Sequence, residues 1–349
     1  MSLYVPILKN RTIEMRVIKE LISIGLSYNT IPMIEVIQEK SRSNSNQDYV
    51  EEIKNLFINS NKNFFLDIPK INITGSTSEA VRNFMTRINR QKGFWFNELK
   101  RFNNVDGAIP VLSYNSKEIP NEQEVVNNIV ELHKYFSSIA LRLTPTQYNQ
   151  IGEKSLNILN KNDFFIFDID NKGHTNPAFK LNYKSIDKIK KCKDFKSIII
   201  NSNRPSSMHN KDIIDGQPIQ EIDNSLLEMY SLRQYKFDGF GDYACTANSL
   251  PSTGGAISPA GIYYSFDNNF FVGYKARIPS LSEFQTYIAP QIVNSQYWNE
   301  YDKKHHDSCP GCKKIKSISI GVDSGKNQGT WKGICMSHYI YTIDQLMKK

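Results

Sequence analysis

The chain has 349 residues, of which 40% are hydrophobic and 22% are charged, and its formal net charge is +8 at pH 7. This much apolar material can fill one large core or two ordinary ones, and it excludes a generally disordered chain. The positive charge suits an anionic partner, which could be nucleic acid, a nucleotide or an acidic protein surface.

Eight short apolar segments are predicted to form strands. Each is rich in β-branched or aromatic residues and is bounded by Asn, Asp, Gly, Pro or Ser. Several are apolar at nearly every position, which is typical of strands buried on both faces. The predicted strands are YVPILK (4–9), TIPMIEVI (30–37), NFFLDIP (63–69), AIPVLSY (108–114), SIALRLT (138–144), DFFIFDID (163–170), KSIIINS (196–202) and FDGFGDY (237–243).

Amphipathic segments alternate with these strands. Apolar residues recur at helical spacing in 13–25 and 121–136, the stretch 78–103 predicts two helices separated at Gly93, and 224–236 predicts another helix. Strict alternation over about 240 residues favours a (β/α)8 TIM-like barrel. A doubly wound open sheet is the alternative, but it usually carries a Gly-rich turn after its first strand, and LKNRT contains no glycine.

The alternation stops after Tyr243. Residues 244–261 are predicted to form a long loop of small residues, 261–278 a β-hairpin, and 281–302 a helix. We therefore expect two parts. The barrel occupies 1–243, and a C-terminal extension, 244–349, carries the loop, the hairpin and a zinc-binding helical tail packed on the barrel.

In such barrels, catalytic groups gather at the C-terminal ends of the strands. Charged residues there predict one ligand site that binds or processes a small anion: Glu35, Asp67, Asp168 and Asp242 as catalytic residues, and Lys9, Arg142, Arg204 and Asp238 as ligand-binding residues. Arg142 is the best candidate to hold the anion, because its planar guanidinium can bind phosphate at two points. The carboxylates could also hold Mg²⁺. The alternative is that these charges simply pair with one another across the barrel mouth.

We expect Glu35, Asp67, Arg142, Asp168 and Asp242 to converge in one cleft. Motifs of nucleophilic enzymes are missing from the sequence, since it contains no GxSxG segment and no Cys–His pair on the predicted strands.

The tail contains two pairs of metal ligands, Cys309-x2-Cys312 and Cys335-x2-His338. This spacing is typical of a structural, tetrahedral Zn²⁺ site. We expect these four residues to fix the tail without catalysing a reaction, since a closed site leaves no position for water. The neighbouring His305 and His306 could replace His338 or support the ligands.

The other two cysteines, Cys192 and Cys245, are expected to be ordinary buried thiols. An odd number of cysteines, three of them clustered, argues against a disulfide framework. The first residues show no secretory signal, and no apolar run approaches the roughly 20 residues that span a bilayer. We therefore expect a cytoplasmic protein that does not contact a membrane.

Short motifs distributed along the chain support a family resemblance. They are YVPILKNRTIEM, IPMIEVI, Leu141-Arg142, FFIFDID, FGDY at 240–243, the hairpin IYYSFDNNFFVGYKA and the terminal TWKGICMSHYIYTIDQL. Together they resemble the Beta protein family of bacteria and phages. Members often end in a His-His pair, whereas Ser337 precedes His338 here. The resemblance implies no activity, but it implies a setting in mobile or anti-phage defence gene clusters, with a partner protein.

Three functions remain open from the sequence. The first is a defence protein whose barrel pocket binds or processes a phosphorylated or nucleotide-like ligand. The second is a sensor or scaffold that recognises a phage protein or a partner effector through the loop 244–261 and exposed hairpin aromatics, namely Tyr263, Tyr264, Phe270 and Phe271. Direct nucleic-acid binding is the weakest, because no basic stripe alternates with aromatic residues.

Overall fold

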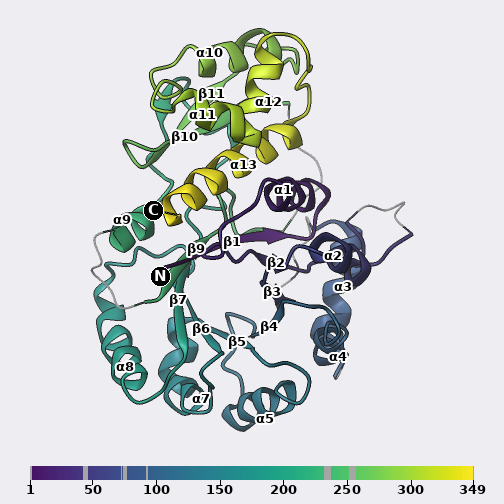
Figure 1. The fold of residues 1–349 in the computed structure, drawn as a ribbon, viewed down its shortest axis with the longest axis vertical. Coiled ribbons are helices and arrows are strands. Elements are labelled where there is room, and N and C mark those ends of the chain that lie inside the picture. Colours follow the sequence, from purple (N-terminus) through teal and green to yellow (C-terminus); the bar gives the residue numbers. More distant parts are fainter. Residues whose placement is uncertain are drawn as a thin grey trace.

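Eight parallel strands close into a barrel surrounded by helices (Figure 1), in the order β1-β2-β3-β4-β5-β6-β7-β9. The computed structural model describes residues 2–41, 46–71, 73, 77–91, 93–231, 237–250 and 257–348. Strand β9 closes the barrel, because Gly239 pairs with Ile198 of β7 and with Leu3 of β1. The predicted (β/α)8 architecture is confirmed, and the open sheet is excluded.

The barrel strands coincide with the eight predicted segments. Their bounds are β1 (Leu3–Lys9), β2 (Met33–Glu35), β3 (Phe64–Asp67), β4 (Ala108–Ser113), β5 (Ala140–Leu143), β6 (Phe164–Asp168), β7 (Lys196–Asn201) and β9 (Gly239–Asp242).

The helices of the barrel cover its outer face (Figure 1). They are α1 (Thr12–Ser23), α2 (Tyr49–Phe57), α3 (Glu79–Arg90), α4 (Phe94–Lys100), α5 (Glu122–Leu132), α6 (Pro145–Gln147), α7 (Glu153–Leu156), α8 (Lys180–Lys190) and α9 (Ser225–Ser231). The break predicted at Gly93 is confirmed, since this residue adopts φ 77° between α3 and α4, a conformation that glycine adopts at little cost.

Side chains that alternate along the strands fill the barrel interior. Val5, Ile7, Phe65 and Ile166 belong to an apolar inner cluster that contains no residue of the outer helices. Because side chains alternate with a period of two, the next inward positions along these strands carry Lys9, Asp67 and Asp168. The barrel interior is therefore apolar along most of its length and charged at the C-terminal ends of the strands.

The extension after β9 forms its own small core. The hairpin β10 (Ala260–Ser265) and β11 (Phe270–Lys275) pairs with the short strand β8 (Gln217–Pro218), in the order β10-β11-β8. Helices pack against this sheet: a π-helical turn (Phe284–Ile288), α10 (Ala289–Val293), α11 (Lys303–Ser308), α12 (Pro310–Ser319) and α13 (Gln328–Met347). The helix predicted over 281–302 is shorter than expected and ends at Val293.

Helix α13 joins the extension to the barrel. It runs beside α1 towards α9 (Figure 1). Tyr339 and Ile340 share a core cluster with the outward-facing Tyr4 and Phe240 of the barrel strands. The extension thus supplies a helix to the outer layer of the barrel. None of the described helices combines the length and apolar character that crossing a membrane requires.

Candidate functional site

Charged side chains from neighbouring strands meet at the C-terminal mouth of the barrel. Lys9 pairs in register with Glu35, and Glu35 pairs with Asp67, so these residues lie at one level. Arg142 on β5 and Asp168 on β6 reach the same level from the opposite side, and all five side chains are buried. The structure thus brings together four of the five residues expected to converge, namely Glu35, Asp67, Arg142 and Asp168.

Arg142 lies at the centre of this group and uses all five of its N–H donors within the protein. Nε and Nη2 donate to Asp168 Oδ2 at 2.9 and 2.6 Å, and Nη1 donates to Glu35 Oε1 and Asp67 Oδ2, both at 2.8 Å. The last donor, on Nη2, binds the hydroxyl of Tyr243 at 2.9 Å. A guanidinium has five donors, so Arg142 has none left for a ligand. Arg142 organises the carboxylates, so its predicted role in binding an anion would require it to give up one of these hydrogen bonds.

The mouth holds three carboxylates against two cations, Lys9 and Arg142. Burial opposes ionisation of Glu35, but the charges of Lys9 and Arg142 hold its pKa at about 2. Burial raises the pKa of Asp67 to about 6, with Arg142 opposing and Glu35 adding to the shift. Asp67 is therefore the carboxylate that relieves the excess negative charge by taking up a proton, and it does so close to neutral pH.

A cleft of about 510 Å³ opens above these residues. Glu35, Ser113, Arg142 and Asp168 contribute to its floor, whereas Asp67 is fully buried below it. Ser113 connects the two levels, because it lines the cleft and its Oγ donates to Asp67 Oδ1. Within the described residues the mouth carboxylates form no metal-ligating group, which leaves the expected Mg²⁺ without support.

Asp242 does not belong to the mouth, contrary to the prediction. Its carboxylate accepts hydrogen bonds from Tyr4 at 3.1 Å and from Tyr339 of α13 at 2.9 Å, in the layer outside the barrel. Burial raises its pKa to about 6. The next residue, Tyr243, points inward and donates to Glu35 Oε1 at 2.7 Å. The prediction missed Tyr243 because one residue along a strand reverses the face.

Two predicted ligand-binding residues also lie away from the mouth cleft. Asp238 precedes β9 at the opposite end of the barrel, where it accepts hydrogen bonds from Lys190 Nζ at 2.6 Å and from the Ser197 N–H at 2.7 Å. It therefore has a structural partner. Arg204 follows β7 and, like Lys9, lines a second pocket beside the mouth.

Four metal-ligating side chains meet in the extension: His305, Cys309, Cys312 and His338. One ligand atom from each lies within 4.8 Å of the others. This quartet differs from the predicted one at a single position, because His305 of α11 takes the place expected for Cys335. Residues three apart on a helix differ in direction by about 60°, so Cys335 and His338 face different neighbours.

The surroundings of the quartet orient its ligands. His338 Nδ1 lies 3.6 Å from Cys309 Sγ and 3.4 Å from Cys312 Sγ, while Nε2 faces the Tyr264 carbonyl oxygen at 3.2 Å. Because that carbonyl accepts a hydrogen bond from Nε2–H, the lone pair of Nδ1 points to the thiols. His305 Nε2 is buried and has no hydrogen-bond partner among the described residues.

Gly311 allows this arrangement by its small size. A Cβ atom at this position would lie 2.6 Å from the Ile334 carbonyl oxygen and 2.8 Å from His338 Cβ. Helix α12 therefore approaches α13 closely enough for its cysteines to reach His338 only because residue 311 is glycine.

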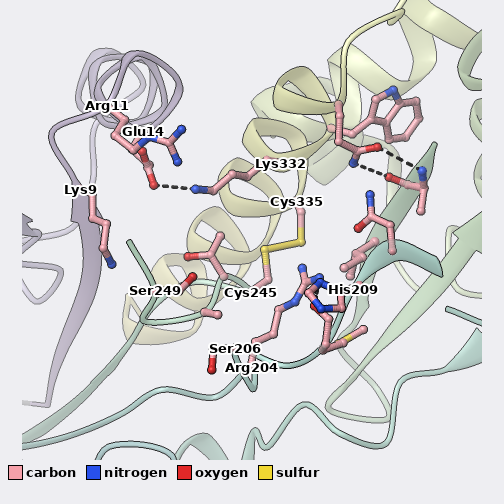
Figure 2. Close-up of a pocket in the computed structure, with 18 of the residues that line it drawn as sticks. Lys9, Arg11, Glu14, Arg204, Ser206, His209, Cys245, Ser249, Lys332 and Cys335 are labelled. Carbon is pink, nitrogen blue, oxygen red and sulfur yellow. Dashed lines mark hydrogen bonds and ion pairs between the residues drawn. A yellow bond between two sulfur atoms is a disulfide. The ribbon is translucent and has the colours of Figure 1, made fainter. Parts of the chain in front are cut away.

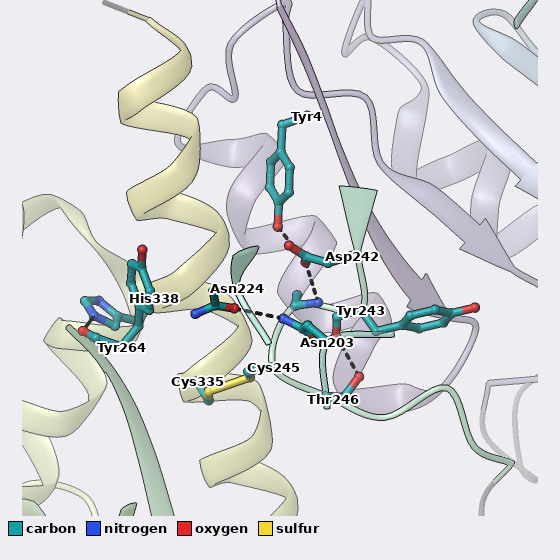
Figure 3. The surroundings of a disulfide bond; sticks show 11 residues. Tyr4, Asn203, Asn224, Asp242, Tyr243, Cys245, Thr246, Tyr264, Cys335 and His338 are labelled. Carbon is teal, nitrogen blue, oxygen red and sulfur yellow. Dashed lines mark hydrogen bonds between the residues drawn. A yellow bond between two sulfur atoms is a disulfide. The ribbon is translucent and has the colours of Figure 1, made fainter. Parts of the chain in front are cut away.

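Cys335 instead forms a disulfide with Cys245 (Figure 3), which corrects the expectation of a free thiol at Cys245. The backbone after β9 turns sharply, with positive φ at Ala244 (46°) and Cys245 (67°), and so brings Cys245 to α13. The fifth cysteine, Cys192, was expected to be buried and is exposed.

The hairpin aromatics are not an exposed recognition surface. Tyr263, Tyr264 and Phe271 are buried, and Tyr263 stacks on the His338 ring with centroids 4.2 Å apart. Phe270 is partly buried against Tyr297. Part of the loop proposed for the same role, residues 251–256, lies outside the described residues. The scaffold hypothesis therefore loses the aromatic anchors on which it depended.

Comparison with known proteins identifies one family and several solved structures with a similar fold. The model of the Beta protein family matches residues 4–344. No curated protein matches the chain. A solved GH18 chitinase from Pseudoalteromonas aurantia is similar with a TM-score of 0.38 and 12% sequence identity, over 69% of this chain and 93% of that chain. A likeness of this size carries no argument about the chemistry of the mouth.

Proposed function

The chain belongs to the Beta protein family, and we propose that its barrel mouth binds and processes a phosphorylated, nucleotide-like small molecule in anti-phage defence. The observation that carries the chemical part is the Ser113–Asp67 pair. Ser113 reaches the cleft, and the buried carboxyl behind it has a pKa of about 6.

The pair can work as a proton relay. A ligand hydroxyl or bound water in the cleft gives its proton to Ser113 Oγ, while the Ser113 hydroxyl proton moves to Asp67 Oδ1. Efficient acid–base groups have a pKa near the working pH, and Asp67 meets that condition. Arg142 holds Asp67, Glu35 and Asp168 in fixed positions, so the relay is already formed before a ligand enters.

Two lysines support a phosphorylated ligand in a cleft whose lining also carries Glu35, Asp168 and Asp170. Lys70 and Lys117 contribute to the lining of the cleft, and the chain as a whole carries a net charge of +8. The defence role is supported by the family resemblance alone, which also implies a partner effector. Recognition of a phage protein would be the alternative role, and it needs a surface other than the buried hairpin aromatics.

A phage-protection assay in cells that express the protein tests this proposal. Ser113→Ala and Asp67→Asn are expected to abolish protection, because each breaks the relay. Asp67→Asn leaves two carboxylates facing two cations, so the variant is expected to fold. Ser116→Ala is the matched control, because Ser116 lines the same cleft and is exposed. Full protection by both relay variants, with melting temperatures like the wild type, contradicts the proposal.

We also propose that His305, Cys309, Cys312 and His338 hold one structural Zn²⁺. Two imidazoles and two thiolates suit zinc, and a tetrahedral site places its ligand atoms roughly 3–4 Å apart. A bound metal ion would also satisfy His305 Nε2, which is buried and has no hydrogen-bond partner among the described residues. Such a site joins α11, α12 and α13 into one unit, and the hairpin contacts it through the Tyr264 carbonyl oxygen.

Metal analysis of the purified protein tests the zinc proposal. We expect about one equivalent in the wild type and in Cys335→Ser, and a large loss in His305→Ala and Cys312→Ser. Cys335→Ser is the informative control, because it removes a nearby cysteine that lies outside the quartet. Zinc loss in Cys335→Ser with zinc retained in His305→Ala would restore the quartet predicted from the sequence and reject this one.

A further inference from the structure

A second pocket, of about 380 Å³, lies between the ends of β1 and β7, the turn after β9 and helix α13. Figure 2 shows Lys9, Arg11 and Lys332 on one side of it and Arg204 and His209 on another, with the Cys245–Cys335 disulfide between them. We call it the basic pocket. These five side chains and Glu14 are its titratable lining residues apart from the disulfide cysteines.

The positive charge of the basic pocket is only partly neutralised by the protein. Lys332 pairs with Glu14 at 2.7 Å, and Lys9 pairs with Glu35 at 3.2 Å. Arg204 has no carboxylate partner among the described residues, and its Nη2 donates only to the Met208 carbonyl oxygen at 3.4 Å. Arg11 likewise forms no ion pair with a described carboxylate. Two partly buried guanidinium groups are thus left without a counter-charge.

Such an arrangement is unfavourable without an anion. Burial lowers the pKa of Arg204, which reports the cost of keeping its charge away from water. Burial also lowers the pKa of Lys332, and although Glu14 opposes the shift, Arg11 and Lys9 add to it. The cations therefore lie close enough to repel one another. An anion in the pocket would relieve both the desolvation and the repulsion.

The position of the basic pocket in the barrel suits a phosphate. Arg204 follows the seventh barrel strand, and Thr246 and Ala247 follow the eighth. In (β/α)8 barrels the loops after these two strands frequently bind phosphate. The pocket also adjoins the mouth, because Ser206 lines both cavities and Lys9 contacts Glu35 of the mouth.

We propose that the basic pocket binds the phosphoryl groups of the ligand, held by Arg204 and Arg11, while the organic part of the ligand extends past Ser206 into the mouth cleft. This inference rests on the proposed function, to which it adds the place and the chemistry of phosphate recognition. A guanidinium binds two phosphate oxygens at once through its planar N–H groups, whereas Lys9 and Lys332 already have carboxylate partners that offset their charge.

Isothermal titration of the full chain with inorganic pyrophosphate, at fixed ionic strength, tests the pocket. We expect one site per chain, with binding weakened about tenfold or more in Arg204→Ala and in Arg11→Ala, since each loses charge-assisted hydrogen bonds. Arg90→Ala is the matched control, because it removes the same charge from an exposed position at the end of α3. Circular dichroism checks that each variant is folded.

The outcomes separate this inference from the proposed function. Asp67→Asn should bind pyrophosphate like the wild type, because the relay does not contact the pocket. Tighter binding of ADP than of pyrophosphate identifies a phosphorylated organic ligand, and equal binding identifies the inorganic anion. The inference is overturned if the wild type shows no saturable binding of pyrophosphate up to about 10 mM. Equal affinities of Arg204→Ala, Arg11→Ala and Arg90→Ala also overturn it, whatever the phage assay shows.

Discussion

Asp242 and Tyr243 are neighbours in the chain, yet their side chains lie on opposite sides of the barrel wall. Figure 3 shows Asp242 beside Tyr4, while the Tyr243 side chain points away from them. Asp242 also contacts Tyr339 in the outer layer, whereas Tyr243 contacts Arg142 and Glu35 at the mouth. The end of the eighth barrel strand and the residue after it therefore contribute to two separate environments, the outer layer and the mouth.

The first prediction concerns the pH dependence of stability in Asp242→Asn. Burial raises the pKa of Asp242 from 3.8 to about 6, so the folded protein binds this proton more tightly than the unfolded chain does. The stabilising contribution is complete below pH 3.8 and is lost as the pH rises through 6. Asparagine cannot ionise, its Oδ1 can still accept from Tyr4 and the Ala244 N–H, and its Nδ2 can donate to the Tyr339 hydroxyl, which then acts as the acceptor.

We therefore expect Asp242→Asn to exceed the wild type in free energy of unfolding by about 3 kcal/mol at pH 8 and to equal it near pH 4. Urea denaturation across this range measures the difference. Asp267→Asn removes the same charge from the exposed hairpin turn and serves as the control. A variant less stable than the wild type at pH 8 would show that the ionised carboxylate is favourable here.

Arg142→Ala is expected to destabilise the barrel strongly. It leaves three buried carboxylates facing only Lys9, and breaking a buried ion pair in this way costs about 3–5 kcal/mol. Arg101→Ala is the comparison, because Arg101 also binds two carboxylates, Glu98 and Asp48, but its side chain is 41% exposed. That loss should stay below about 1 kcal/mol. Similar melting temperatures for the two variants would argue against the central role of Arg142.

Gly311→Ala is expected to disturb the proposed zinc site without changing any of its ligands. The added methyl group would overlap the Ile334 carbonyl oxygen, so α12 has to move away from α13, at a cost of about 1–3 kcal/mol. We expect a lower melting temperature and faster loss of metal to a chelator. Gly173→Ala, whose methyl group would have its nearest neighbour at 4.0 Å, should behave like the wild type.

Reduction of the Cys245–Cys335 disulfide is expected to lower stability by about 2–4 kcal/mol, since the bond closes a long segment of chain. The two cysteines are 90 residues apart. Thiol titration of the denatured, metal-free protein should find three free thiols before reduction and five after it. Cys192→Ser should leave stability unchanged, because Cys192 is exposed. Five thiols without reductant would exclude the bond.

The barrel itself could be predicted from the sequence because its strands are continuous apolar segments bounded by polar residues, as in FFIFDID. The outward direction of Asp242 was also readable, since it shares its face with the apolar Phe240, two residues earlier. The sequence did not reveal that all five N–H donors of Arg142 are used within the protein, because this depends on how three distant strands align. The replacement of Cys335 by His305 in the metal-ligating quartet could not be predicted either. It depends on the turn after β9, where two residues adopt left-handed conformations although neither is glycine.

Helix α13 gives the chain an order in which its parts can become stable during synthesis. Tyr4 and Phe240, on the first and the eighth strand of the barrel, pack in one cluster with Tyr339 and Ile340, which follow all eight strands in the chain. A ribosome-bound chain that has released only the eight strands still exposes this seam to water. A barrel on which α13 has not yet docked therefore exposes apolar strand surface, and such surface favours aggregation.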